Sequence, residues 1–182
     1  MITVSLYWQM GNSAQHEQFE RYLTPRVYQR AWNYACRLSP THEDAEDLLQ
    51  DALAKAYRGL PGLREPERFG AWLLTIIRNS FLSRRRPQQI MLDSYWHELA
   101  AAEEPEDPLV AAILGALKQL TPEQRELISL FYLDGLSLKE TGWVLGLAPQ
   151  VVGQRLHRAR RALRKVLVTS RMVGPEPQRC RQ

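Results

Sequence analysis

Cysteine is scarce in this sequence: Cys36 and Cys180 are the two cysteines among 182 residues. Two cysteines can build neither a framework of disulfides nor a zinc site with four cysteine ligands. Cys36 falls within an apolar helical pattern, whereas Cys180 lies in a polar tail. We therefore expect Cys36 to be a small residue of the hydrophobic core.

Long apolar runs are absent as well. No window approaches the ~18 consecutive apolar residues that a membrane-spanning helix requires. Residues 1–10 have neither the basic start nor the long apolar core of a signal peptide. We therefore expect a cytoplasmic protein that does not insert into a membrane.

The sequence also lacks the alternation of β-branched and polar residues that marks a β-strand. Apolar residues recur instead every three or four positions nearly throughout. Thr41, Thr121 and Ser137 stand where their side chains can cap the first turn of a helix. We predict an all-α protein with helices at about residues 17–38, 41–58, 67–86, 109–120, 121–133, 137–145 and 149–168.

The helices are expected to form two small domains joined by a flexible acidic linker. Pro87 ends the first group of helices, and the stretch that follows is acidic and shows little helical periodicity. The predicted division is an N-terminal extension at 1–15, an N-terminal domain at 16–87, the linker at 88–107, a C-terminal domain at 108–168 and a disordered tail at 169–182.

Charge is unevenly distributed along the chain. The formal net charge is only +4, but residues 41–51 hold five acidic residues and no basic one. Residues 150–171 hold seven basic residues and no acidic one. This segregation predicts one surface for a polyanion and another for a basic partner.

The last two predicted helices are joined by the short turn 146–148, which contains glycine and is typical of a helix-turn-helix. The second of these helices places Val152, Leu156 and Ala159 on one face, with glutamine and arginine residues on the other. Glutamine can recognise the edge of adenine and arginine that of guanine in the major groove. We therefore expect duplex DNA as a ligand; a solvated basic face is the alternative.

At residues 119–165 the sequence resembles the C-terminal promoter-binding domain of the extracytoplasmic-function (ECF) group of sigma-70 factors, and RLHRARRALR is close to a recurring string of that group. DAEDLLQDALAKAYRGL and FGAWLLTIIRNSFLSRRRP resemble the N-terminal domain of the same group. The resemblance spans roughly residues 18–168. Two motif-rich blocks in the family's order, with no third domain between them, make a chance match improbable.

The resemblance implies that the helix at 44–57 docks on a coiled coil of the largest catalytic subunit of RNA polymerase. The polar face that would do so comprises Glu43, Asp47, Gln50 and Asp51. Two alternatives remain open at this point. The face can be an ordinary solvated surface, or Glu43, Asp47 and Asp51 can bind a metal, although no further ligands are evident in the sequence.

The resemblance also implies two sites for promoter DNA. The N-terminal domain would capture the melted −10 non-template strand. The residues implied for this contact are Leu63, Arg64, Glu65, Thr75, Arg78, Asn79, Arg84, Arg85 and Arg86. Among them, Asn79 would line the pocket for a flipped base. The C-terminal domain would bind the duplex −35 element through Gln150, Gln154, Arg155, His157, Arg158, Arg161 and Arg164.

The family therefore implies a transcription initiation factor that binds core RNA polymerase, has no catalytic centre and needs no cofactor. It also implies an anti-sigma factor as a further partner. A stand-alone helix-turn-helix regulator is the main alternative, but two unlike domains suit two unlike half-sites better than a palindrome. A metal-dependent nuclease is less favoured, because no nucleophile and base are paired in the sequence.

Overall fold

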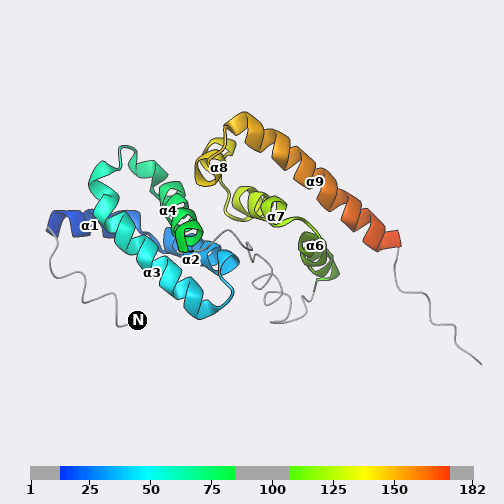
Figure 1. Cartoon of the computed structure of the whole chain (residues 1–182), viewed down its shortest axis with the longest axis horizontal. Helices are drawn as coiled ribbons and strands as arrows, with labels where there is room; N and C mark the ends of the chain where they lie inside the picture. The colour runs from blue at the N-terminus through cyan, green and yellow to red at the C-terminus, as the bar shows by residue number, and fades with distance from the viewer. Residues whose placement is uncertain (1–12, 85–106, 173–182) are drawn as a thin grey trace, which may run out of the picture.

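A computed structural model describes residues 13–84 and 107–172, and their side chains at 14–84 and 107–169. These residues form eight α-helices and, within the described ranges, no β-strand, which confirms the predicted all-α fold. Figure 1 shows them as two neighbouring bundles, α1–α4 and α6–α9. The helices are α1 (Ser13–Tyr22), α2 (Pro25–Leu38), α3 (His42–Gly59), α4 (Phe69–Arg84), α6 (Pro108–Lys118), α7 (Pro122–Ile128), α8 (Leu138–Leu145) and α9 (Pro149–Met172).

The prediction of one helix at 17–38 is wrong in one respect, because the structure has two helices there, α1 and α2. Pro25 has no backbone N–H and cannot continue a helix from the preceding turn. It stands instead at the first position of α2, where Thr24 caps the helix by accepting a hydrogen bond from the Val27 N–H at 3.3 Å. The break lets α1 turn so that the ring of Phe19 is buried against Tyr57 and Phe69.

The remaining helix starts follow the caps expected from the sequence. Thr41 precedes α3, Thr121 precedes α7 and Ser137 precedes α8, and each accepts a hydrogen bond from the third residue of its helix. In α7 and α8 the reciprocal bond is also present, so both have complete capping boxes. Asp107, assigned to the linker from sequence, caps α6 instead.

Two short segments differ from the predicted helices. The α3–α4 connection contains 3₁₀ turns at Leu60–Gly62 and Pro66–Arg68. A π-helical turn at Ser129–Leu133 extends α7, which ends as an α-helix at Ile128. The part of the predicted linker at 88–106 lies outside the described residues.

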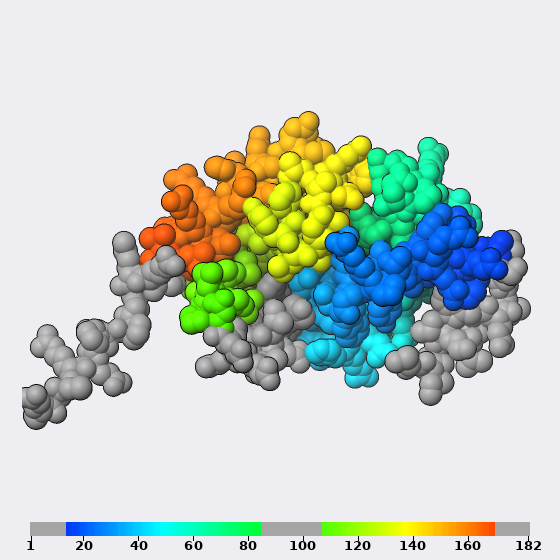
Figure 2. All heavy atoms as spheres, turned by 180° about the vertical axis from the view of Figure 1, so that it is seen from behind, coloured from blue at the N-terminus to red at the C-terminus, as the bar shows by residue number. Residues whose placement is uncertain are grey.

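The hydrophobic core of the first bundle extends into the second. Buried apolar side chains of α2, α3 and α4 form one cluster, which includes Cys36 as expected. Leu130, Leu136 and Val144 belong to the same cluster although they follow the linker. Figure 2 shows the yellow atoms around α8 against the blue atoms of α2 and the green atoms of α4. The two predicted domains are thus packed directly on each other.

Within the part of the chain that the structure describes, none of the helices combines the length and the apolar character needed to cross a bilayer.

Close packing at Gly142 fixes the turn between α8 and α9. A Cβ atom there would lie 2.5 Å from the carbonyl oxygen of Leu147, a contact that requires the backbone to shift. We expect Gly142→Ala to lower the free energy of unfolding by about 1–3 kcal/mol, the usual cost of overpacking. Urea denaturation followed by circular dichroism measures the change.

Gly115 supplies the matched control, because it lies in α6 and has open space where a Cβ would be. Gly115→Ala should stabilise the chain by about 0.5–1 kcal/mol through higher helix propensity. An unchanged stability of Gly142→Ala would show that the turn is not constrained as described.

Candidate nucleic-acid interface

The helix α9 presents a basic face directly opposite its buried face. Val152, Leu156 and Ala159 are buried in a second apolar cluster with residues of α6 and α7. The expected −35 residues are all solvent-exposed, and six of them lie away from the buried face: Gln150, Gln154, His157, Arg158, Arg161 and Arg164. Arg155 lies at the edge of the buried face, where it lines a pocket with residues of α7. The first turns of this face are slightly hollowed between Gln150, Gly153, Gln154, His157 and Arg158.

The turn before α9 gives the helix its direction. Gly146 adopts a left-handed conformation with φ of 69°, which glycine reaches without steric cost. The N–H of Leu147 donates to the carbonyl of Gly142 at 2.8 Å and closes the end of α8. This is a helix-turn-helix, with α9 in the place of the recognition helix.

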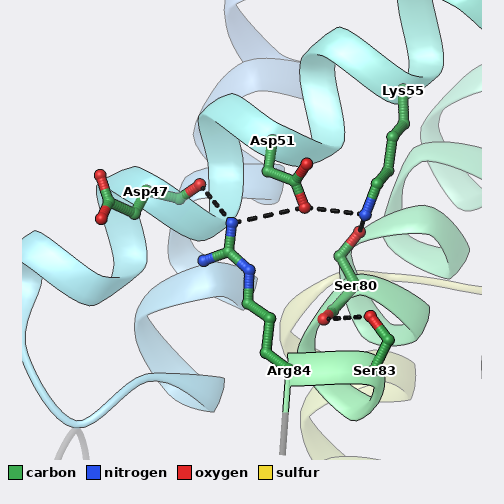
Figure 3. Close-up of polar contacts among 6 residues, drawn as sticks. All are labelled: Asp47, Asp51, Lys55, Ser80, Ser83 and Arg84. Atoms are coloured by element: carbon green, nitrogen blue, oxygen red, sulfur yellow. Dashed lines mark hydrogen bonds and ion pairs between the residues drawn. The ribbon is translucent and has the colours of Figure 1, made fainter.

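The acidic face of α3 divides into two parts. Glu43 and Asp47 have exposed side chains, and Gln50 is half-buried. Asp51 is instead bonded within the bundle, as Figure 3 shows: its carboxylate accepts from Lys55 Nζ at 2.8 Å and lies 3.3 Å from Arg84 Nη2.

The environment of Asp51 keeps it charged. Burial alone would raise its pKa, but the hydrogen bond and charge of Lys55, with the charge of Arg84, lower the pKa below the ordinary value. Arg84 also donates to the backbone carbonyl of Asp47 at 3.1 Å, so it ties α4 to the middle of α3. Asp51 and Arg84 therefore hold this face in shape, and the side chains of Glu43 and Asp47 stay exposed.

A metal site was one alternative interpretation of Glu43, Asp47 and Asp51 on this face. Across residues 14–84 and 107–169, no three histidine, cysteine, aspartate or glutamate side chains gather as a metal site would require.

Asn79 lies in a pocket of about 440 Å³ between α3 and α4. Its side chain is exposed, and the walls combine polar and apolar groups: Lys55, Gly59, Trp72, Ile76, Ser80 and Ser83. Lys55 Nζ donates to Ser80 Oγ at 2.9 Å, as Figure 3 shows. The pocket thus offers an amide, a cation and an aromatic edge, which suit an unstacked base.

Sequence reasoning missed Lys55, Ser80 and Ser83 as neighbours of Asn79. The available signal was the spacing of Lys55 one turn after Asp51, which puts the amine on the side of α3 that faces α4.

Leu63, Arg64, Glu65 and Thr75, which were expected to contact the −10 strand, line a second pocket of about 340 Å³ that does not include Asn79. Its walls come from the α3–α4 connection and from one face of α4: Gly62, Leu63, Arg64, Glu65, Arg68, Trp72 and Thr75. Trp143 of α8 completes the pocket. The guanidinium of Arg68 lies 4.2 Å from the centre of the Trp143 ring, in a cation–π contact.

Arg78 points neither into this pocket nor into that of Asn79. Its Nε donates to Glu126 Oε1 of α7 at 3.0 Å. Burial would lower its pKa, but the Glu126 carboxylate outweighs that effect and raises the pKa above the ordinary value of arginine. Arg85 and Arg86, which were expected to follow phosphates, lie outside the described residues.

Two protein-family models match this sequence. The model of Sigma-70 region 2 matches residues 21–90, and that of Sigma-70 region 4 matches residues 111–163. The first covers α2–α4, and the second covers the helix-turn-helix through Leu163.

Two relatives and one solved structure resemble the chain over most of its length. The ECF RNA polymerase sigma factor SigM of Mycobacterium tuberculosis is 32% identical over 85% of this chain and 82% of its own. SigE of Mycolicibacterium smegmatis is 34% identical over 76% of this chain, which spans only 57% of that protein. The sigma factor RpoE of Bartonella quintana, solved with the anti-sigma factor NepR, superposes with a TM-score of 0.60 at 26% identity, covering 86% of this chain and 98% of that one. The chain belongs to the ECF group of the sigma-70 family of RNA polymerase sigma factors.

Proposed function

We propose that this chain is a transcription initiation factor that binds core RNA polymerase and directs it to promoters. The observation that carries the proposal is the basic, exposed face of α9 in a helix-turn-helix, within a chain that also contains a region 2 bundle. The factor has no catalytic centre of its own and needs no cofactor. Since it works on the polymerase, we expect it in the cytoplasm.

The two DNA-binding tasks fall to different parts of the chain. We assign residues 16–87 to core docking and the −10 strand, and residues 108–168 to the −35 duplex. Asn79 and its pocket would receive a base extruded from the melted strand, because a flipped base needs both a polar edge and a surface to stack on. The α9 face would enter the major groove.

Polymerase docking is assigned to the exposed acidic part of α3. Glu43 and Asp47 are free to meet a basic coiled coil, with Gln50 beside them. Asp51 supports the site indirectly, because its bonds to Lys55 and Arg84 hold α3 against α4.

We also propose an anti-sigma factor as a partner. The support is the likeness to RpoE of Bartonella quintana, which was solved bound to the anti-sigma factor NepR.

One experiment separates this function from that of a stand-alone helix-turn-helix regulator. Transcription of a genomic library by reconstituted holoenzyme identifies a promoter, which is then footprinted with the chain alone, core alone and both together. The initiation factor should protect the −35 region and make −10 thymines reactive to permanganate only when core is present. Protection by the chain alone, over a palindrome and without melting, would favour the regulator.

Charge reversal on α3 tests the docking face. We expect Asp47→Lys to reduce co-purification with core polymerase at least tenfold, since one fully used charge contact contributes about 1.4 kcal/mol or more. Pull-down with tagged core measures the loss.

The matched control is Glu17→Lys, which reverses another exposed acidic residue and changes the net charge equally. Co-purification of Asp47→Lys at the level of this control would contradict the assignment of α3.

Substitutions on α9 should separate base recognition from phosphate binding. Gln154 and Arg158 lie in the first turns, so their change to alanine should flatten the preference at particular −35 base pairs by ~1–3 kcal/mol. Arg161 and Arg164 lie farther along, so their loss should weaken all sequences about equally and reduce the salt slope by roughly one unit per phosphate contact. Binding of holoenzyme to single-base promoter variants at several salt concentrations distinguishes the two effects. The reverse assignment would mean that α9 lies in the groove in another orientation.

A further inference from the structure

The exposed face of α9 contains a hollow near the start of the helix. It is lined by Gln150, Gly153, Gln154, His157 and Arg158. The hollow has a volume of about 480 Å³, is open to solvent and has a mostly apolar inner surface. An open hollow of this kind admits the edge of a base pair, whereas a site for a free small molecule would enclose most of its ligand.

Gly153 leaves this space open because it has no side chain. It lies within the helix and, unlike Gly146, does not have a positive φ. A Cβ atom at Gly153 would have Leu138 Cδ1 as its nearest neighbour outside the adjoining backbone, at an ordinary contact distance of 4.0 Å. Neither backbone conformation nor packing therefore requires glycine, which costs stability inside a helix relative to alanine. The remaining physical reason for a glycine is the close approach of a ligand.

The chemistry of the hollow indicates which group approaches. Leu138 is the first residue of α8, lies beside Gly153 and has a side chain that is 39% exposed, so it extends the apolar surface. In the major groove, the apolar group that a base pair presents is the C5 methyl group of thymine. Phosphates and the amino and carbonyl groups of base edges need polar partners instead. The hollow therefore suits a methyl group on a pyrimidine.

The polar residues that line the hollow favour thymine as the source of this methyl group. Gln150 and Gln154 are both exposed there. A glutamine amide accepts from the N6 amino group of adenine and donates to its N7, and adenine pairs with thymine. 5-Methylcytosine carries the same methyl group, but its partner guanine offers no donor to the glutamine carbonyl in the major groove.

We propose that the hollow at Gly153 recognises the C5 methyl group of a thymine in the −35 element, while a glutamine beside it binds the adenine of the same or the neighbouring base pair. The inference rests on the proposed function and adds to it the base that α9 selects and the group that selects it. A side chain at position 153 would occupy the place of the methyl group.

Replacement of thymine by deoxyuridine tests the proposal on the parent chain. Deoxyuridine pairs with adenine as thymine does but lacks the methyl group. Each thymine of the −35 element, on either strand, is replaced in turn in a promoter that the holoenzyme transcribes, and the Kd of the holoenzyme is measured. At least one replacement should weaken binding about fourfold, the effect of one buried methyl group.

The variant Gly153→Leu connects this effect to the hollow. Its side chain fills the space, so it should bind the thymine promoter about fourfold or more weakly than the parent chain does. It should also bind the thymine and deoxyuridine promoters equally. Gly115→Leu is the matched control, because Gly115 is an exposed glycine of α6 with open space for a Cβ. This control should keep the fourfold effect of deoxyuridine, and circular dichroism checks that both variants are helical.

A pair of 5-methylcytosine and guanine at the sensitive position separates the two sources of the methyl group. It should bind about tenfold or more weakly than the thymine–adenine pair, because the glutamine carbonyl loses its donor. Equal binding of the two pairs would overturn the assignment to thymine.

Three further results would each overturn the proposal. They are equal affinity of the parent holoenzyme for every deoxyuridine promoter, an undiminished deoxyuridine effect in folded Gly153→Leu, and a −35 element without thymine on either strand. Each of them leaves the proposed function intact, because core-dependent protection and melting test that function separately. A chain that protects no promoter in the presence of core would refute the proposed function and this inference with it.

Discussion

Charged side chains buried between α2, α4 and the α7 segment are the constraint on which the arrangement of this molecule depends. A buried ion loses its hydration, and only a nearby opposite charge or hydrogen bond compensates for the loss. Arg37 and Asp134 meet this condition only while the two bundles are in contact. The ion pair therefore fixes which faces of the two bundles meet.

The same principle explains why two acidic residues of α3, Asp47 and Asp51, have different environments. Asp51 lies where Lys55 and Arg84 can bond to it, and its lowered pKa keeps the carboxylate charged at neutral pH. Asp47 contributes only its backbone carbonyl to that network, so its side chain stays in solvent. Two acidic residues one turn apart on a helix thus have different roles, one within the bundle and one at its surface.

Much of the fold could be predicted from sequence because its signals are local. Caps at Thr41, Thr121 and Ser137 depend on neighbours three residues away, and the apolar stripe of α9 depends on helical periodicity. Pro25 was also a local signal for a helix break. The prediction missed that break because the apolar pattern continues on both sides of the proline. The exposed residues of α9 followed from the same periodicity.

The rest depended on contacts between residues far apart in the chain. Arg78 was expected to face DNA, and nothing near it in sequence indicates Glu126, 48 positions away. Trp143 resembles an ordinary helix residue until the fold brings it over Arg68. The packing of the two bundles was missed for this reason, since an acidic linker indicates only that they are separate in sequence.

The most direct test of the account is a charge exchange at the buried ion pair. Arg37→Glu places two carboxylates together at a site where both side chains are 4% exposed, and should lower the free energy of unfolding by about 3–5 kcal/mol. The exchange Arg37→Asp with Asp134→Arg should recover most of that loss, and Arg26→Glu, an exposed reversal on the same helix, should change little. Urea denaturation followed by circular dichroism measures all three, and a stability of Arg37→Glu equal to that of the parent chain would contradict the account.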